Sequence, residues 1–306
     1  MSRIHEALKK AAEERLAQVP VESRVEIGDV ASEKQLFPVT AAMHVEACKN
    51  VDRPEVPGLL RFEDLIKHCA HPKWRVDSQW SVFGDTATSK VGAERFRTLR
   101  SRLQQIGTAG HMRRILVTSS LPGEGKTFVS FNLAQSIVRQ PERRVLLIDA
   151  DLRESRLHLV LGAPKTPGLT DYLRGEADEF SVIQNGLGDN LCFIAGGSAV
   201  SNPSELLQSE RMKKLFELVT PVFDWIILDS PPTIPVHDAS ALADMCHGVL
   251  FVVRAGATSF ETAGKAAREF REKNLLGVVF NGAEKGTAYG SYDYGYSGDR
   301  EPERAK

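Results

Sequence analysis

The sequence of 306 residues has few cysteines, no long apolar run and almost no net charge. Its four cysteines (Cys48, Cys69, Cys192 and Cys246) are widely spaced without a CxxC pair, which excludes a disulfide framework and favours free thiols in a reducing compartment. Lys and Arg number 39 against 40 Asp and Glu, so the formal net charge is −1. Polyanion-binding proteins carry a basic excess, and we therefore expect no nucleic-acid partner.

Long apolar segments are missing as well. The longest runs, such as residues 248–253, fall far short of the roughly 20 residues that cross a bilayer, and the N-terminus is too charged for a signal peptide. We therefore expect a cytoplasmic protein. Tyrosine is scarce too, and four of the five tyrosines lie within eight residues, at Tyr289, Tyr292, Tyr294 and Tyr296.

The pattern of the chain divides it into three parts. Residues 1–85 contain a first helix followed by a proline-interrupted, irregular arm, and residues 284–306 are a flexible tail rich in Gly, Ser, Tyr and charge. Residues 86–283 alternate apolar strands with helices, which predicts a doubly wound, mostly parallel α/β sheet. The predicted strands are 115–119, 145–150, 191–195, 225–230, 249–254 and 277–281, and the predicted helices are 126–139, 203–219, 237–246 and 259–273.

A phosphate-binding loop lies between the first predicted strand and its helix. The run SLPGEGKT at residues 120–127 has glycines that let successive N–H groups turn toward phosphate oxygens. Its lysine reaches the β- and γ-phosphates and its threonine can ligate Mg²⁺, although Ser120 replaces the usual first glycine. The sequence thus predicts a nucleotide site formed by Pro122, Gly123, Glu124, Gly125, Lys126, Thr127 and Phe128.

Two further strands end in carboxylates. The run VLLIDADLR ends in Asp149, Asp151 and Arg153, and WIILDSPP carries Asp229 at its strand end. Carboxylates at strand ends beside a phosphate-binding loop hold Mg²⁺ and its waters. Since Asp149 and Asp151 are two residues apart, one is expected to serve Mg²⁺ and the other to face an acceptor.

In combination, these motifs resemble those of the bacterial tyrosine kinases (BY-kinases) of capsular and exopolysaccharide biosynthesis. The resemblance covers about residues 86–296 and includes PGEGKT, the hydrophobic-DxDxR and hydrophobic-DSPP runs, and the stretches 168–175 and 202–207. It implies a P-loop NTPase fold and an ATP-dependent protein-tyrosine kinase that uses Mg²⁺.

The resemblance also implies roles for single residues. Lys126 would bind the phosphates and Thr127 would ligate Mg²⁺. Asp149 and Asp151 would share Mg²⁺ coordination and activation of the acceptor hydroxyl, with their division of labour left open, and Asp229 would act on Mg²⁺ through water. The implied metal set is Thr127, Asp151 and Asp229, and the implied catalytic set is Lys126, Asp149, Asp151 and Asp229.

Assembly and regulation are implied in the same way. In the family, a helix carrying the pattern found here at Glu94, Arg97 and Arg100 packs kinase subunits into a ring. A C-terminal tyrosine cluster, here residues 289–296, is phosphorylated in trans by a neighbouring subunit. The expected partners are other copies of the chain and a separate transmembrane regulator of polysaccharide chain length, which would recruit the kinase to the inner face of the membrane.

Two alternatives remain open at this stage. A ParA/MinD-like ATPase switch shares the fold, but such proteins place an extra lysine near the start of the phosphate-binding loop, where this chain has Ser120, Leu121 and Pro122. A non-catalytic ATP-binding partner of a chain-length regulator is the second. A eukaryotic-type kinase is excluded because no HRD or DFG run exists.

Overall fold

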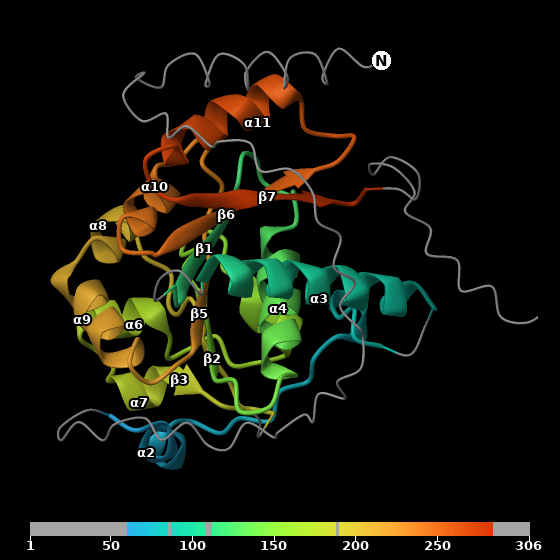
Figure 1. Ribbon diagram of the computed structural model, residues 1–306. Helices are drawn as coiled ribbons and strands as arrows, with labels where there is room; N and C mark the ends of the chain where they lie inside the picture. The colour runs from blue at the N-terminus through green and yellow to red at the C-terminus, as the bar shows by residue number, and fades with distance from the viewer. Residues whose placement is uncertain (1–59, 85–86, 108–111, 188–189, 284–306) are drawn as a thin grey trace, which may run out of the picture. The chain divides into compact units, whose positions relative to one another are not determined.

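The computed structural model of the chain describes residues 60–84, 87–107, 112–187 and 190–283, which build a seven-stranded sheet flanked by helices (Figure 1). The strands are β1 Arg114–Ser119, β2 Val145–Asp149, β3 Ile183–Gln184, β4 Leu191–Ile194, β5 Trp225–Asp229, β6 Gly248–Arg254 and β7 Leu275–Asn281. The α-helices are α2 Phe62–His68, α3 Ala87–Gly107, α4 Lys126–Val138, α5 Leu157–Leu161, α6 Leu169–Arg174, α7 Glu179–Val182, α8 Pro203–Leu207, α9 Glu210–Val219, α10 Asp238–Ala243 and α11 Phe260–Ala267, with 3₁₀ turns at Ser78–Trp80 and Arg268–Phe270.

The order of the strands places the predicted motifs side by side. It is β3-β4-β2-β5-β1-β6-β7, with every neighbouring pair parallel except β3 and β4. The strand before the phosphate-binding loop, β1, lies next to β5, and β5 lies next to β2. This confirms the doubly wound α/β fold, and it gathers the ends of all three motif strands at the edge where such sheets bind ligands.

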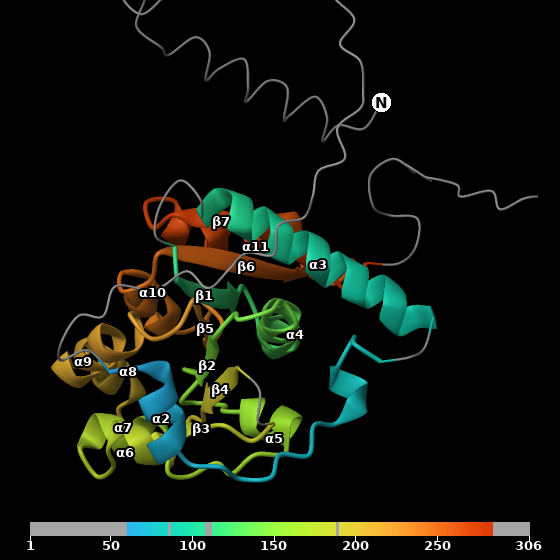
Figure 2. The ribbon, with the colours of Figure 1, turned by 60° about the horizontal axis from the view of Figure 1, so that its bottom comes forward.

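Each central strand is buried on both faces, which explains its continuous apolar sequence. Along β1, Ile115 and Val117 pack with α3, α4 and α5, whereas Leu116 faces the opposite cluster, formed with α2, α6, α9 and α10. Figure 2 shows α3 and α4 on one side of the sheet and α6, α9 and α10 on the other. Both faces therefore contribute a core, and the sheet forms the middle of three layers.

The six predicted strands are all present, and the antiparallel β3 was not predicted because it is only two residues long. The continuous helix predicted over 203–219 is wrong. The structure has two helices there, since Ser209 is extended (φ −69°, ψ 158°) and its side chain accepts a hydrogen bond from the N–H of Met212, which starts α9 afresh. The helix predicted over 259–273 ends as α11 and continues as a 3₁₀ turn.

Residues 60–84 differ from the irregular arm expected for residues 1–85. Phe62 and Leu65 of α2 are buried in one core cluster, and Trp74 is buried in the other. The Phe62 ring meets the ring of Phe223 edge-on with centroids 5.7 Å apart, and the Arg144 guanidinium lies 4.7 Å from its centre. This part of the chain is therefore an integral piece of the domain core. The local sequence did not show this because the partners of these residues, such as Phe223, lie far along the chain.

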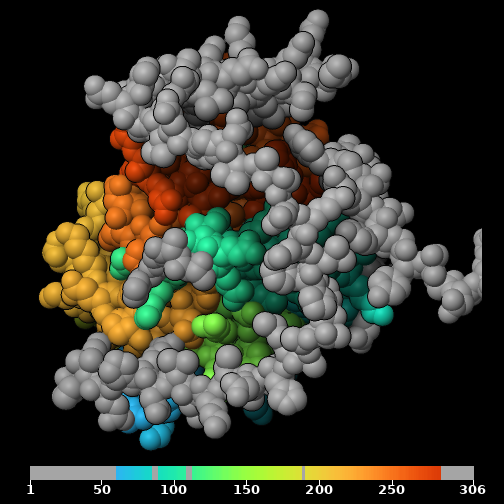
Figure 3. Space-filling view, viewed as in Figure 1, coloured from blue at the N-terminus to red at the C-terminus, as the bar shows by residue number. Residues whose placement is uncertain are grey.

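The long helix α3 runs beside α4 and the last strands. Phe96 and Leu103 of α3 are buried in a core cluster against which the half-buried Leu276 and Val279 of β7 pack. In the space-filling view, the teal side chains of α3 lie between the green of α4 and the orange-red of the C-terminal strands (Figure 3). No helix in the described part of the chain is long and apolar enough to span a bilayer.

The role of residues 60–84 is tested by Phe62→Ala. Removing this buried ring should lower the free energy of unfolding by about 3 kcal/mol, since it leaves a cavity against Phe223. The matched control is Phe260→Ala, whose side chain is 92% exposed and whose loss should change stability by about 0.5 kcal/mol or less. Urea unfolding measures both, and equal stability of the two variants would contradict the packing described.

Candidate active site at the carboxyl ends of the parallel strands

The predicted phosphate-binding loop connects the end of β1 to the start of α4. Gly123 and Gly125 both have positive φ, at 78° and 95°, and Gly125 caps the N-terminus of α4. A side chain at 125 would be strained, and its Cβ would overlap the side-chain amide of Asn281. The backbone thus turns into the helix in the way a phosphate-binding loop requires, with the positive end of the helix dipole beneath it.

A buried carboxylate within this loop fastens it to the neighbouring strands. Glu124 is 2% exposed, and its Oε2 accepts a hydrogen bond from the N–H of Leu121 at 2.6 Å. Its Oε1 accepts from the N–H of Arg254 at 3.3 Å and from the hydroxyl of Thr258. The amide of Asn281 donates to the carbonyl of Glu124 at 3.0 Å. The loop is therefore already shaped by the ends of β6 and β7.

The two acidic strands place their carboxylates side by side. Asp149 of β2 and Asp229 of β5 are register partners at the carboxyl ends of adjacent parallel strands. Asp229 accepts hydrogen bonds from the hydroxyl of Thr127 at 2.7 Å and from the hydroxyl of Ser130 at 3.2 Å. The strand-end carboxylate thus touches the residue of the phosphate-binding loop that the sequence predicts as a Mg²⁺ ligand.

The carboxyl group of Asp149 is fully buried. Its Oδ2 accepts hydrogen bonds from the hydroxyl of Ser155 at 2.8 Å and from the N–H of Leu157 at 3.0 Å. Its Oδ1 has no hydrogen-bond partner among the described residues. Burial raises the pKa of Asp149, and the neighbouring carboxylate of Asp229 raises it further.

Asp151 and Lys126 complete this cluster of charged groups. Burial also raises the pKa of Asp229, and the positive charge of Lys126 opposes this rise. Asp151 and Lys126 are each 8% exposed. The Oδ1 of Asp151 accepts a hydrogen bond from the N–H of Glu154 at 3.0 Å, and burial raises the pKa of Asp151 against the effects of that bond and of Lys126. Three carboxyl groups thus meet one lysine in a largely dry place, an arrangement that attracts a cation.

The remaining predicted residues are placed as follows. Pro122 and Gly123 are exposed, whereas Phe128 is half-buried with its ring edge-on to Phe96 at 6.0 Å. Tyr172, the tyrosine outside the C-terminal cluster, is buried in the core and packs beneath the guanidinium of Arg211. The four tyrosines of the tail lie outside the described residues.

The predicted assembly residues lie on α3. Glu94 and Arg97 are exposed and form an ion pair of 2.9 Å. Arg100 is half-buried, and its guanidinium donates to the carbonyl of Ser136 near the end of α4 at 2.6 Å. Within one chain, Arg100 therefore fastens two helices together, while Glu94 and Arg97 face solvent.

The sequence did not reveal that Arg254, Thr258 and Asn281 hold the phosphate-binding loop. It also did not reveal that Asp238 and Ser204 hold Arg153. Of these, Asn281 carried a usable signal, since it ends a predicted strand at the edge of the sheet where ligands bind. The others contact the motifs from distant parts of the chain, and nothing in their local sequence marks them.

The sheet order, the glycine-shaped loop and the paired strand-end carboxylates define a P-loop NTPase. A family model described as an AAA domain matches residues 112–268. Among curated proteins, the chain is 33% identical over 218 residues to tyrosine-protein kinase YwqD of Bacillus subtilis, covering 70% of this chain and 92% of that one. It is 34% identical over 220 residues to tyrosine-protein kinase CpsD of Streptococcus agalactiae, covering 71% and 94%.

A longer relative and a solved structure agree with these matches. The putative tyrosine-protein kinase EpsB of Ralstonia solanacearum is 34% identical over 255 residues, covering 75% of this chain but only 34% of EpsB. The structure of the kinase domain of Escherichia coli tyrosine kinase ETK matches with a TM-score of 0.62 and 29% identity, covering 78% of this chain and 96% of that one. The chain belongs to the bacterial tyrosine-protein kinase family.

The burial of Asp149 predicts a pH dependence of stability. In the unfolded chain its carboxyl ionises near pH 4, but in the folded protein only at higher pH, so folding loses stability as the pH rises from about 4 through the raised pKa. Asp149→Asn avoids this loss and keeps an oxygen for Ser155 and Leu157. Without nucleotide or Mg²⁺, the variant should therefore melt above the wild type at pH 8.5, with the advantage shrinking or reversing at pH 4.5.

Thermal unfolding measured by circular dichroism checks this sign. The control is Asp178→Asn at the start of α7, where hydrogen bonds from Ser181 lower the pKa of the carboxyl. That variant should gain no stability at pH 8.5. An identical pH profile for Asp149→Asn and the wild type would show that the carboxyl group carries no such cost.

Proposed function

We propose that this kinase transfers the γ-phosphoryl group of ATP to tyrosines 289–296 of another copy of the same chain. The observation that carries the proposal is the register pairing of Asp149 with Asp229 beside the Lys126 and Thr127 end of the phosphate-binding loop. Phosphoryl transfer needs little covalent chemistry from the protein and depends on positioning and charge neutralisation. A loop that receives phosphates, next to paired carboxylates, supplies both.

The donor set fits Mg²⁺. Among the described residues, no three His, Cys, Asp or Glu side chains are grouped to hold a metal by themselves. Mg²⁺ in such sites takes only one or two protein ligands and completes its shell with phosphate oxygens and water. Of the predicted set, Thr127 and Asp229 are proposed to hold it, which leaves Asp151 to face the acceptor, and the unpartnered Oδ1 of Asp149 is consistent with a cation nearby. When bound, the ion neutralises charge on the β- and γ-phosphates.

The residues of the chain divide the remaining work. Lys126 binds phosphate oxygens, and Asp149 holds the strand end through Ser155 and Leu157. Asp151 is the more accessible of the two aspartates on that run, and its raised pKa suits it to accept a proton. The phenol oxygen attacks the γ-phosphorus, the bond to the β-phosphate oxygen breaks, ADP leaves, and the phenolic proton passes to the carboxylate of Asp151.

The tail is well placed in the sequence for such a reaction. It begins shortly after β7, whose last residue Asn281 contacts the phosphate-binding loop.

Each phosphate adds about −1.5 to −2 charges, so four would add about −6 to −8 to a chain with a net charge of −1. Phosphorylated tails would repel the acidic site and one another. We therefore expect copies that assemble through Glu94, Arg97 and Arg100 to separate when the tails are fully phosphorylated.

The proposed biological setting is control of exopolysaccharide or capsule synthesis and export, at the inner face of the membrane and together with a transmembrane chain-length regulator. A relative from Klebsiella pneumoniae, 32% identical over 197 residues, is described as a putative tyrosine-protein kinase in the cps region. The match covers 27% of that relative, which therefore has additional sequence.

The ATPase-switch and non-catalytic alternatives are less well supported. Residues 120–122 are Ser, Leu and Pro, so the loop lacks the lysine that the switch proteins place there. Asp149, Asp151 and Asp229 are all retained, whereas a protein that only bound ATP would not need three costly buried carboxyl groups.

The proposal is tested by incubating the full chain with Mg²⁺ and ATP and mapping phosphotyrosine by mass spectrometry. We expect phosphate at Tyr289, Tyr292, Tyr294 or Tyr296, and we expect Lys126→Met to reduce it at least about a hundredfold because the phosphates lose their cation. The matched control is Lys213→Met, which removes an exposed lysine on α9 and should leave the signal unchanged. Absence of phosphotyrosine in this region, with a membrane activator supplied, would overturn the proposal.

A further inference from the structure

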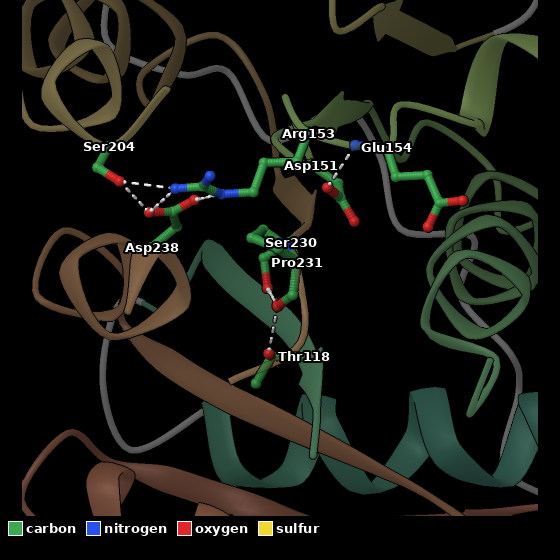
Figure 4. A network of polar contacts seen from close by, with 8 residues as sticks. All are labelled: Thr118, Asp151, Arg153, Glu154, Ser204, Ser230, Pro231 and Asp238. Atoms are coloured by element: carbon green, nitrogen blue, oxygen red, sulfur yellow. Dashed lines mark hydrogen bonds and ion pairs between the residues drawn. The ribbon is translucent and has the colours of Figure 1, made fainter. Parts of the chain in front are cut away.

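The DxDxR run contains a residue for which the function above provides no role. Arg153 extends away from the aspartates to a carboxylate on another element (Figure 4). Its Nε donates to Oδ2 of Asp238 at 2.7 Å, and its Nη2 donates to Oδ1 of Asp238 at 3.3 Å and to the hydroxyl of Ser204 at 3.0 Å. Ser204 in turn donates to Asp238. Because the contact is two-pronged, it fixes both the place and the orientation of the guanidinium.

The carboxylate of Asp238 is buried, unlike the carboxylates of ordinary surface ion pairs. Asp238 is 2% exposed and stands at the start of α10, the first helix after Asp229 and β5. A buried carboxylate costs free energy unless it is paired and hydrogen-bonded, and here both of its oxygens are satisfied by Arg153 and Ser204. The pair therefore joins the connection that follows one acidic strand to the connection that follows the other.

The segment that carries Arg153 wraps around the catalytic aspartates. Within it, the N–H of Glu154 binds Asp151, and the Ser155 hydroxyl and the Leu157 N–H bind Asp149. The contacts to Asp149 tie Ser155 and Leu157 to the end of β2, whereas residues 151–154 are held by the contact between Glu154 and Asp151 and by the packing of Leu152. Arg153 lies between Asp151 and Ser155 and attaches this segment to α10, which lies beyond β5.

We propose that Asp238 is a positioning residue that, through Arg153, fixes the segment bearing Asp151 for phosphoryl transfer. This inference rests on the function proposed above. Asp238 touches neither nucleotide nor acceptor. Its effect is geometric, and misplacement of a reacting group by about 1 Å can cost about a hundredfold in rate. The phosphate-binding loop is held separately by Glu124, so loss of the pair should leave ATP binding nearly intact.

The first test uses hydrogen–deuterium exchange of the full chain without nucleotide. Asp238→Asn, which keeps the shape of the side chain, and Arg153→Gln should each speed exchange in residues 150–157 at least about threefold while leaving residues 120–127 unchanged. The matched control is Arg156→Gln. Arg156 lies in the same segment and pairs with Glu154, but both side chains are exposed. Unchanged exchange in residues 150–157 would overturn the proposal.

The second test separates kcat from KM for ATP in tail phosphorylation. Asp238→Asn and Arg153→Gln should lower kcat about tenfold to a hundredfold with KM changed less than about threefold, and Arg153→Lys should restore part of the rate because it keeps the charge but loses the fork. Wild-type rates in these variants, or loss of kcat accompanied by faster exchange in residues 120–127, would contradict a positioning role.

The two tests also distinguish this inference from the proposed function. If the wild-type chain phosphorylates its tail and the variants match it, the positioning role fails alone. If the wild type transfers no phosphate at all, the proposed function fails, and the exchange experiment still decides whether Asp238 holds the segment.

Discussion

The structure depends on holding two buried carboxyl groups, those of Asp149 and Asp229, side by side at the end of a parallel sheet. Burial raises the pKa of both, and a neighbouring carboxylate raises each further, Asp229 acting on Asp149 and Asp151 acting on Asp229. The surrounding residues offset this rise, with hydroxyls from Thr127 and Ser130 on one carboxyl group and the positive charge of Lys126 close by. A site kept in this condition is prepared for a cation, since a positive charge offsets the repulsion between the carboxyl groups.

The rest of the domain keeps this arrangement in register. The three strands that carry the motifs are adjacent because the sheet has the order β2-β5-β1. Apolar packing on both faces of the sheet holds these strands in place. Buried carboxylates at the periphery then fix the connecting segments, with Glu124 holding the phosphate-binding loop and Asp238 holding Arg153. Packing thus sets the positions of the strands, and buried polar contacts set the loops that follow them.

The fold and the centre of the site could be predicted from sequence because their signals are local. A run of apolar residues ending in Asp, or a glycine-rich turn between strand and helix, is legible within about ten residues. The supports of the site could not be predicted in this way. Arg153 and Asp238 are 85 positions apart, and Glu124 and Arg254 are 130 apart. The burial of residues 60–84 escaped prediction for the same reason, since only the folded sheet brings Phe62 to Phe223.

A mixture of two variants decides whether one copy phosphorylates the tail of another. One chain carries Lys126→Met with its tail intact. The other keeps its active site but has Tyr289, Tyr292, Tyr294 and Tyr296 replaced by Phe. After incubation with Mg²⁺ and ATP, mass spectrometry should find phosphotyrosine in the tail of the Lys126→Met chain. An unmodified tail in this mixture, under conditions in which the wild-type chain phosphorylates itself, would contradict the account.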